Sequence, residues 1–312
     1  MTQSLDEGSD TLAHDPADGI AWVDGRYVPI AEASIPILDR GFLRSDVTYD
    51  VVHVKDGRFF RLDAHLDRFF QSIERLRMSI PQSKADVAHI LTECVRRTGL
   101  RDAFVSMNCT RGVPPKGVRD PRLCKNKFYA YVHGFVWIAN EEQRKAGLKL
   151  IVSSIQRIPP ESVDPRIKNY HWLDMTMGLF EAYDRGAETV VLHDGKGNVT
   201  EGPGFNIFSV KGGRIATPER GMLEGITRRS VIELARENGI VCEERPVSIK
   251  ELMASDEIFL SSTAGGIMPV TQIDAQFIGN GHPGVVTEQV NAIYWQSHAS
   301  ARYATPIDYG RA

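Results

Sequence analysis

Apolar and polar positions alternate along two runs near the N-terminus, and an Asp-Gly pair interrupts each run. The runs cover residues 21–30 and 47–62, and the pairs stand at positions 24–25 and 56–57. An Asp-Gly pair between alternating apolar residues is typical of the tight turn of a β-hairpin. The pattern therefore predicts two hairpins in the first part of the chain.

Helical spacing replaces the alternation over residues 63–78, where apolar residues recur on one face. Asp63 has the side chain of a typical N-cap for this helix. A second helix is predicted over residues 84–98, and Gly99 is suited to end it because glycine adopts the left-handed conformation that closes many helices. The two hairpins are thus followed by two helices.

Two further strands are predicted at residues 104–110 and 128–138. The segment between them, residues 111–122, is rich in proline, glycine and charged residues, so no regular element is expected to run through it. Long segments of this kind often carry function. We therefore regard this loop as a candidate part of a functional site.

The second half of the chain mixes isolated helices with short apolar runs. Helices are predicted at about 170–185, 227–237 and 286–299. The predicted strands are 148–156, 190–193, 205–210, 214–216, 241–245 and 257–260. Because the helices do not alternate regularly with the strands, the order favours an α+β or mixed α/β fold over a regularly wound parallel sheet.

The length of 312 residues suits two domains better than one. A polar and charged stretch without strong periodicity, residues 139–147, is the predicted interdomain linker. We expect a small α/β domain over residues 18–138 and a large domain over residues 148–312. The acidic, polar residues 1–17 are expected to form a flexible tail.

Charge and composition argue against several classes of protein. The 37 Lys and Arg residues nearly balance the 40 Asp and Glu residues, and a net charge of −3 gives no electrostatic reason to expect binding to nucleic acid or to an anionic membrane. No apolar run is long enough to span a bilayer, and the N-terminal stretch lacks the basic and apolar parts of a signal peptide.

The four cysteines are too sparse for a disulfide framework and form no C-x-x-C pair. We therefore expect reduced thiols and a cytoplasmic location. The histidines are scattered, and no set of histidine, cysteine and carboxylate residues has the spacing of metal ligands. No metal site is predicted.

Several polar residues stand beside apolar strand or helix ends. Lys168 precedes a predicted helix, Glu201 lies between two apolar runs, and Arg68 projects from the first predicted helix. The helix that begins near Thr227 offers free N–H groups, and the turn at residues 263–266 offers more. Taken singly, each of these is an ordinary surface, turn or capping residue.

Taken together, these residues meet the needs of an enzyme that uses pyridoxal 5′-phosphate. Such an enzyme needs a lysine to carry the cofactor and move a proton, and a carboxylate beside the pyridine nitrogen so that the ring accepts electrons. It also needs an arginine and helix N-terminal amides for the phosphate. The chain contains every one of these groups.

At these positions the sequence resembles the class IV aminotransferases, the fold-type IV pyridoxal phosphate enzymes, from about residue 21 to residue 309. The stretches that carry the resemblance are LRSDVTYDVV, GRFFRLDAHLDRF, FVSMNCTRG, VDPRIKN, TEGPGFNIF, GMLEGITRRSV and DEIFLSSTAGGIMPV. Lys-Asn, followed some 30 residues later by Glu-Gly-x-x-x-Asn and then by Gly-Ile-Thr-Arg, is a specific order. The resemblance implies a two-domain α+β architecture and a homodimer whose sites borrow a loop from the partner.

The resemblance also implies a role for each matching residue. Lys168 is the catalytic lysine that binds the cofactor and shuttles a proton, and Glu201 pairs with the pyridine nitrogen. Asn206 supports the ring side of the cofactor. The residues expected to hold the phosphate are Arg68, Ile226, Thr227 and Thr263.

Within the family, the chain looks most like the (R)-selective amine:pyruvate transaminases, which accept amines without a carboxylate. By that match the expected substrate-site residues are Tyr49, Val51, Phe104, Trp172 and Ala264. These residues imply an apolar pocket that favours a hydrophobic group.

Pyruvate and other 2-oxo acids carry a carboxylate, and arginine binds carboxylates through two parallel hydrogen bonds. Arg119, in the long loop, is the candidate for a mobile clamp that binds a 2-oxo acid and withdraws from a bulky amine; Arg111 and Arg122 are alternatives. The Arg-x-His carboxylate trap of the D-amino-acid enzymes is missing, because Asp120 and Pro121 follow Arg119.

Two positions depart from the amine transaminases. Arg44 stands where they usually have histidine, and Ser106 stands where they tend to have glutamate. An added arginine and one acid fewer favour carboxylated substrates. D-amino-acid and branched-chain aminotransferase activities therefore stay open, as do, with less support, an aminodeoxychorismate lyase-like activity and a binding protein that retains only the fold.

Overall fold

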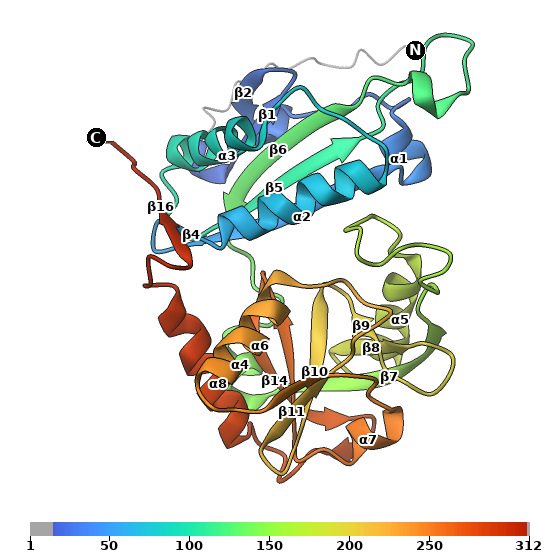
Figure 1. Ribbon diagram of the computed structural model, residues 1–312, viewed down its shortest axis with the longest axis vertical. Coiled ribbons are helices and arrows are strands. Elements are labelled where there is room, and N and C mark those ends of the chain that lie inside the picture. Colours follow the sequence, from blue (N-terminus) through green and yellow to red (C-terminus); the bar gives the residue numbers. More distant parts are fainter. Residues whose placement is uncertain (1–14, 311–312) are drawn as a thin grey trace, which may run out of the picture.

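The computed structural model describes residues 15–310, so residues 1–14 of the predicted tail lie outside the described residues. The described chain begins with a 3-10 helix, η1 (Pro16–Asp18), whose first turn is capped by the Asp15 carboxylate. Two β-sheets, each accompanied by helices, lie one above the other in Figure 1. The mixed α/β class expected from the sequence is confirmed.

The first sheet is entirely antiparallel, with the strand order β16-β4-β3-β5-β6-β1-β2. Its strands are β1 (Ile20–Val23), β2 (Arg26–Pro29), β3 (Val47–Lys55), β4 (Arg58–Phe60), β5 (Ala103–Thr110), β6 (Lys127–Gly134) and β16 (Ala304–Pro306). Both predicted hairpins are confirmed, since β1 pairs with β2 and β3 pairs with β4.

Helices α2 (Leu62–Arg75) and α3 (Lys84–Thr98) lie against the first sheet (Figure 1). Their apolar faces join the sheet in one core, in which Phe69 and Leu91 are fully buried. Both helices were expected, but Asp63 is not the N-cap of α2. The helix instead starts after Arg61, which has a left-handed conformation and makes no side-chain cap, and Asp63 lies in the first turn.

The second sheet is mixed, with the order β12-β11-β10-β13-β14-β7-β8; in addition, β9 pairs with β10 and β15 pairs with β14. Three neighbouring pairs are parallel: β11 with β12, β14 with β7, and β7 with β8. The strands are β7 (Leu148–Gln156), β8 (Thr189–His193), β9 (Glu201–Gly202), β10 (Phe205–Lys211), β11 (Arg214–Thr217), β12 (Cys242–Glu244), β13 (Glu257–Ser262), β14 (Gly266–Ile273) and β15 (Gln276–Phe277).

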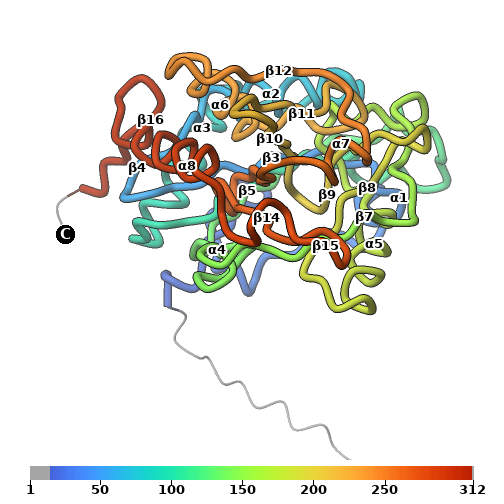
Figure 2. Tube along the Cα trace, turned by 90° about the horizontal axis from the view of Figure 1, so that it is seen from below, coloured from blue at the N-terminus to red at the C-terminus, as the bar shows by residue number. Residues whose placement is uncertain are grey.

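Three longer helices pack on the second sheet, at two separate places. Helix α5 (Leu173–Asp184) packs on β7 and β8, whereas α6 (Ile226–Glu237) and α8 (Val285–Ser297) pack on β13 and on each other. Figure 2 shows α5 and α8 at opposite ends of this sheet. Besides η1, the short helices within residues 15–310 are η2 (Ile30–Glu32), α1 (Arg40–Arg44), η3 (Pro121–Leu123), α4 (Glu141–Ala146) and α7 (Ile249–Met253).

Besides the N-cap of α2, the structure corrects the sequence prediction at three further places. The strand expected to reach residue 138 ends at Gly134. The expected linker contains a helix, α4, closed at its start by a capping box between Asn140 and Gln143. The buried strand β14 was not predicted; it begins at the second residue of a Gly-Gly pair, which is typical of a turn.

The C-terminal residues return to the first sheet, where β16 pairs with β4 (Figure 1). Phe60 of β4 also packs into the core that α6 and α8 form on the second sheet. The division into residues 18–138, 139–147 and 148–312 stays a prediction.

Within residues 15–310, no helix has the length and apolar character needed to cross a membrane. The same part of the chain contains no group of histidine, cysteine and carboxylate side chains arranged to hold a metal ion. All four cysteines are free thiols.

Candidate active site

A cavity of about 370 Å³ lies where the first sheet and α2 meet the loops and helices of the second half. It gathers most of the predicted site residues. Those that line it are Tyr49, Val51, Arg68, Phe104, Lys168, Trp172, Glu201, Asn206, Ile226, Thr227, Thr263 and Ala264. A larger, more polar hollow of about 460 Å³ between residues 160–166 and 219–224 contains none of them.

Lys168 lies on the irregular segment that precedes α5. Its backbone carbonyl accepts hydrogen bonds from the Thr48 hydroxyl at 2.8 Å and from the Tyr49 N–H at 3.1 Å. Its Nζ atom lies 4.3 Å from the centre of the Tyr49 ring. Burial, assisted by the positive charge of Arg68, lowers the pKa of Lys168 to about 8. Near neutral pH a larger fraction of this amine than of an exposed lysine is therefore uncharged and nucleophilic.

Glu201 is buried in the short strand β9, directly before the turn into β10. One of its oxygens accepts from Arg157 Nε at 3.1 Å and the other from the Leu223 N–H at 2.9 Å. Burial raises the pKa of Glu201, although the Arg157 charge opposes the shift. A buried carboxyl group with raised proton affinity suits the sharing of a proton with a ring nitrogen.

Arg157 is a functional candidate that the sequence analysis missed. Besides Glu201, it binds Asp174 of α5 through a 2.7 Å hydrogen bond, so a buried arginine links two buried carboxylates. Its position directly after the predicted strand 148–156 was visible in the sequence. The pairing with Glu201 was not visible, because 44 residues separate the two.

Arg68 of α2 is fixed by a buried carboxylate. Its Nε and one terminal nitrogen donate to the two oxygens of Asp50 at 2.7 and 2.8 Å, and the other terminal nitrogen donates to the Glu224 carbonyl at 3.0 Å. Burial alone would raise the pKa of Asp50, but Arg68 and His65 hold it well below its usual range. A guanidinium has five N–H groups, so three engaged donors leave capacity for an anion in the cavity.

The N-terminus of α6 faces the cavity, with Gly225 as an N-cap that has no side-chain hydrogen bond. Ile226 and Thr227 therefore present the first amides of a 12-residue helix to the cavity, where an anion is favoured. Asn206 packs against the cap, because its Nδ2 donates to the Leu223 carbonyl at 2.8 Å. A Cβ on Gly225 would lie 2.1 Å from Asn206 Oδ1, so this close approach requires glycine.

Two predicted substrate residues, Arg44 and Arg119, are exposed and do not line the cavity. Arg44 lies at the end of α1, where its guanidinium donates to the Leu43 carbonyl at 2.8 Å. The alternative Arg122 is paired with Asp120 at 2.6 Å on the surface. This single chain therefore does not bring the arginines of the predicted clamp to the cavity.

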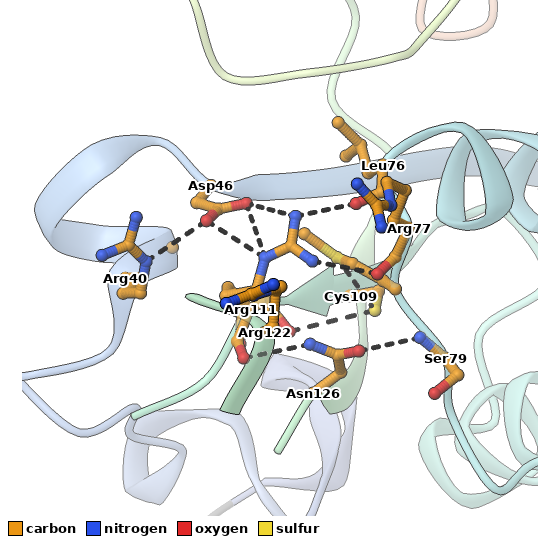
Figure 3. A network of polar contacts seen from close by, with 12 residues as sticks. Arg40, Asp46, Leu76, Arg77, Ser79, Cys109, Arg111, Arg122 and Asn126 are labelled. Atoms are coloured by element: carbon orange, nitrogen blue, oxygen red, sulfur yellow. Dashed lines mark hydrogen bonds and ion pairs between the residues drawn. The ribbon is translucent and has the colours of Figure 1, made fainter. Parts of the chain in front are cut away.

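Arg111, the other alternative, is engaged in structural contacts at the base of the long loop (Figure 3). It pairs with Asp46 at 2.9 Å and donates to the carbonyls of Leu76 and Arg77 just after α2. Asn126 joins the two ends of the loop by donating to the Arg111 carbonyl at 3.0 Å. These contacts anchor the loop and leave Arg111 poorly placed to bind a substrate.

The donor set of the cavity fits pyridoxal 5′-phosphate. A cationic arginine and an uncapped helix N-terminus suit a phosphate, a buried carboxyl group suits a pyridine nitrogen, and a desolvated lysine suits an aldehyde. The phosphate would be held by Arg68, Ile226, Thr227 and Thr263. Glu201 would face the ring nitrogen, and Lys168 would bind the aldehyde carbon of the cofactor. The cofactor, once bound, would supply the electron sink for loss of a proton next to the amine.

Comparison with known proteins agrees with this assignment. Residues 48–273 match the family model described as amino-transferase class IV. The branched-chain-amino-acid aminotransferase of Pseudomonas aeruginosa is 32% identical over 286 residues, which span 89% of this chain and 92% of that protein. The D-alanine aminotransferase of Bacillus licheniformis is 32% identical over 270 residues, or 86% of this chain and 93% of that protein.

A solved structure shares the fold. The branched-chain amino acid aminotransferase from Thermobaculum terrenum, in its holo form with pyridoxal 5′-phosphate, superposes with a TM-score of 0.84 at 26% identity, covering 95% of this chain and 99% of that chain. Fold and site together define a pyridoxal phosphate-dependent aminotransferase. The chain belongs to the class IV aminotransferase family.

Proposed function

We propose that this aminotransferase moves an amino group from an (R)-amine, or from a D-amino acid, to pyruvate or another 2-oxo acid. The observation that carries the proposal is the pairing of both arginines that line the cavity. Arg68 is bound to Asp50, and Arg157 is bound to Glu201 and Asp174. With Lys168 and the remaining Arg68 donors assigned to the cofactor and its phosphate, residues 15–310 place no further cation in the cavity that needs a substrate carboxylate as its partner.

The apolar residues that line the rest of the cavity favour an apolar substituent on the amine. Tyr49, Val51 and Phe104 contribute one side of the cavity, from β3 and β5, and Trp172 with Leu179 contributes another. Burying an apolar group here is favourable by about 25 cal/mol per Å² of surface removed from water. Two walls at different places give large and small substituents unequal surroundings, which is the requirement for choosing one enantiomer.

Arg119 is proposed as the carboxylate clamp for the 2-oxo acid, with Arg44 as a second cation near the entrance. Both side chains are exposed in the single chain. In the proposed homodimer, the loop that carries Arg119 would reach the partner's cavity. An exposed arginine can leave and return at small cost, so one pocket would serve an apolar amine and a charged 2-oxo acid in turn.

A second candidate function is transamination of amino acids as both donor and acceptor. Relatives of this chain are named branched-chain-amino-acid and D-alanine aminotransferases, which favours this candidate. The α-carboxylate would then bind to neutral donors, such as the backbone amide of Thr263, a residue that lines the cavity.

The donor can be tested by mixing the enzyme with single donors and following the absorbance of the cofactor. The donors are (R)- and (S)-1-phenylethylamine, D-alanine, D-glutamate and L-leucine, each then combined with pyruvate or 2-oxoglutarate. The proposal predicts rapid reaction with the (R)-amine and none with the (S)-amine. Rapid L-leucine turnover without (R)-amine activity would instead establish a branched-chain enzyme. A strict preference for D-alanine and D-glutamate would support the D-amino-acid donor and remove the (R)-amine from the proposal.

We also propose a cytoplasmic homodimer, in which a second copy covers the exposed apolar face of α5. Leu173, Met177 and Phe180 recur on that face and are 78%, 52% and 55% exposed. Light scattering should give about twice the chain mass of 34.8 kDa, and Leu173→Arg should shift the protein toward monomer. Val285→Arg, at a site that is also 78% exposed but lies on α8, is the control. A wild-type mass near 34.8 kDa at micromolar concentration would contradict the dimer.

A further inference from the structure

We propose that Asn108 and Tyr170 are positioning residues, which tie the lysine-bearing segment to the first sheet and thereby hold the Lys168 amine against the Tyr49 ring. The inference rests on the proposed role of Lys168 as the cofactor-binding lysine. It concerns two residues outside the cavity lining, joined by a contact between β5 and the segment before α5.

The lysine-bearing segment needs an external support because it has no regular structure of its own. It runs from the end of β7 to the start of α5, with isolated turns and one isolated bridge between Thr48 and Asn169. The two hydrogen bonds to the Lys168 carbonyl come from Thr48 and Tyr49 at the start of β3. The first sheet therefore positions a lysine that belongs to the second half of the chain.

Tyr170 adds a side-chain contact to this backbone attachment. Its hydroxyl donates to Asn108 Oδ1 at 2.7 Å, and Asn108 Nδ2 donates to the Ser106 hydroxyl at 3.1 Å on the same strand. Asn108 is only 6% exposed, so its amide is held in one orientation. Tyr170 lies two residues after Lys168 in the sequence, and its phenol is thereby fixed to β5.

The fixed Tyr170 ring supports the ring that faces the lysine. The rings of Tyr170 and Tyr49 lie with their centres 4.6 Å apart and their planes inclined by 48°. Lys168 Nζ in turn lies over the Tyr49 ring, 4.3 Å from its centre. A chain of contacts thus runs from Asn108 through Tyr170 and Tyr49 to the reactive nitrogen.

Loss of the Tyr170 hydroxyl should disturb the position of Lys168 Nζ without unfolding the protein. The Tyr170→Phe variant keeps the aromatic ring, and Tyr170 is 43% exposed, so no cavity opens in a core. The segment would gain freedom, and water would reach Lys168. Water stabilises the protonated form of an amine, which opposes the desolvation that lowers the Lys168 pKa.

The test uses the full-length, cofactor-loaded enzyme and two readouts other than activity. The first is the pH midpoint of the visible absorbance of the bound cofactor, which reports protonation at Lys168 Nζ. The second is hydrogen exchange of the Tyr49 amide, which donates to the Lys168 carbonyl. In Tyr170→Phe we expect the midpoint to rise by about one pH unit and the amide to exchange about tenfold faster.

Activity provides a third readout. Misplacing a reacting nitrogen by about 1 Å can cost up to about 100-fold, so kcat should fall by about tenfold while the donor KM changes less. Tyr183→Phe is the matched control, because Tyr183 lies on α5, is 57% exposed and does not line the cavity. Asn108→Leu, which removes the acceptor, should reproduce the Tyr170→Phe changes.

Equal midpoints, exchange rates and kcat in wild type and Tyr170→Phe would overturn the inference, as would equal changes in Tyr183→Phe. Failure of the proposed function gives a different result. If Lys168 does not bind the cofactor, borohydride reduction followed by peptide mass spectrometry finds no pyridoxyl group on Lys168 in the wild type. If only the donor assignment fails, the midpoint shift remains.

Discussion

The inner face of the cavity and the long loop outside it use charged residues in opposite ways. On the inner face, Arg157 is 7% and Glu201 is 4% exposed, and each is paired with a buried partner. In the loop of residues 111–126, Arg119 is exposed, and Arg122 is paired with its near neighbour Asp120. Buried pairs have one geometry, whereas exposed side chains can move.

This difference explains why the family motifs support the assignment of the cofactor site more strongly than the assignment of the substrate site. Glu201 is held by the buried Arg157, and Lys168 is held by hydrogen bonds from β3 to its carbonyl, so both residues of the matching motifs lie in the same cavity. An exposed loop can change its charges at little cost in stability. The cofactor assignment consequently has strong support from residue geometry, while the substrate assignment depends on a loop that does not enter the cavity of its own chain.

Replacing Arg157 should have the largest effect on stability, because it breaks the inner-face pairs. Arg157→Leu leaves Glu201 and Asp174 buried without their cation, which costs about 3–5 kcal/mol in unfolding free energy. Urea denaturation of the wild type and the variant measures this loss. Arg229→Leu, which breaks the exposed 3.9 Å pair with Glu233, should cost less than about 1 kcal/mol. Equal losses in the two variants would remove the distinction between inner face and surface.

Replacing Arg68 should have an intermediate effect and act on the cofactor. Losing a charge-assisted hydrogen bond to a phosphate costs about 1.5–3 kcal/mol, so Arg68→Ala should weaken cofactor binding by about ten- to a hundredfold. Equilibrium dialysis measures the dissociation constant. An unchanged constant would mean that Arg68 serves only as the ion-pair partner of Asp50.

Replacing Arg119 should have the smallest effect and act on the acceptor alone. If Arg119 is the mobile carboxylate clamp, Arg119→Ala raises the KM for pyruvate by about tenfold. This change corresponds to the free energy of one exposed charge-assisted hydrogen bond. The reaction of the (R)-amine alone should keep its rate, because that substrate has no carboxylate. Arg122→Ala is the control on the same loop. A slower amine reaction in Arg119→Ala would contradict the clamp.

Local sequence patterns predicted most of the regular elements, because turn residues and periodic apolar positions act over a few residues. β7 agrees with its predicted bounds residue for residue, and α3 also starts and ends where the pattern placed it. β14 was not predicted, because it begins inside a Gly-Gly pair that is typical of a turn, and its apolar run alone does not distinguish a buried strand from other apolar segments.

Nonlocal pairings account for what the sequence could not reveal in the site. The specific motif order pointed to Lys168 and Glu201, but not to Arg157, whose partners are 17 and 44 residues away. Likewise, Tyr170 and Asn108 are 62 residues apart and meet only in the folded chain. Positions 44 and 119 could be compared with family motifs, but the placement of exposed side chains does not follow from their sequence.

The identity of the cofactor-binding lysine is the most direct test of the account. The purified enzyme would be loaded with pyridoxal 5′-phosphate, reduced with borohydride and digested, and the modified peptide would be sequenced by mass spectrometry. The account predicts that the pyridoxyl group is on Lys168 and that the Lys168→Ala variant folds but neither gains the label nor turns over substrate. A label on another lysine, or normal turnover in Lys168→Ala, would contradict it.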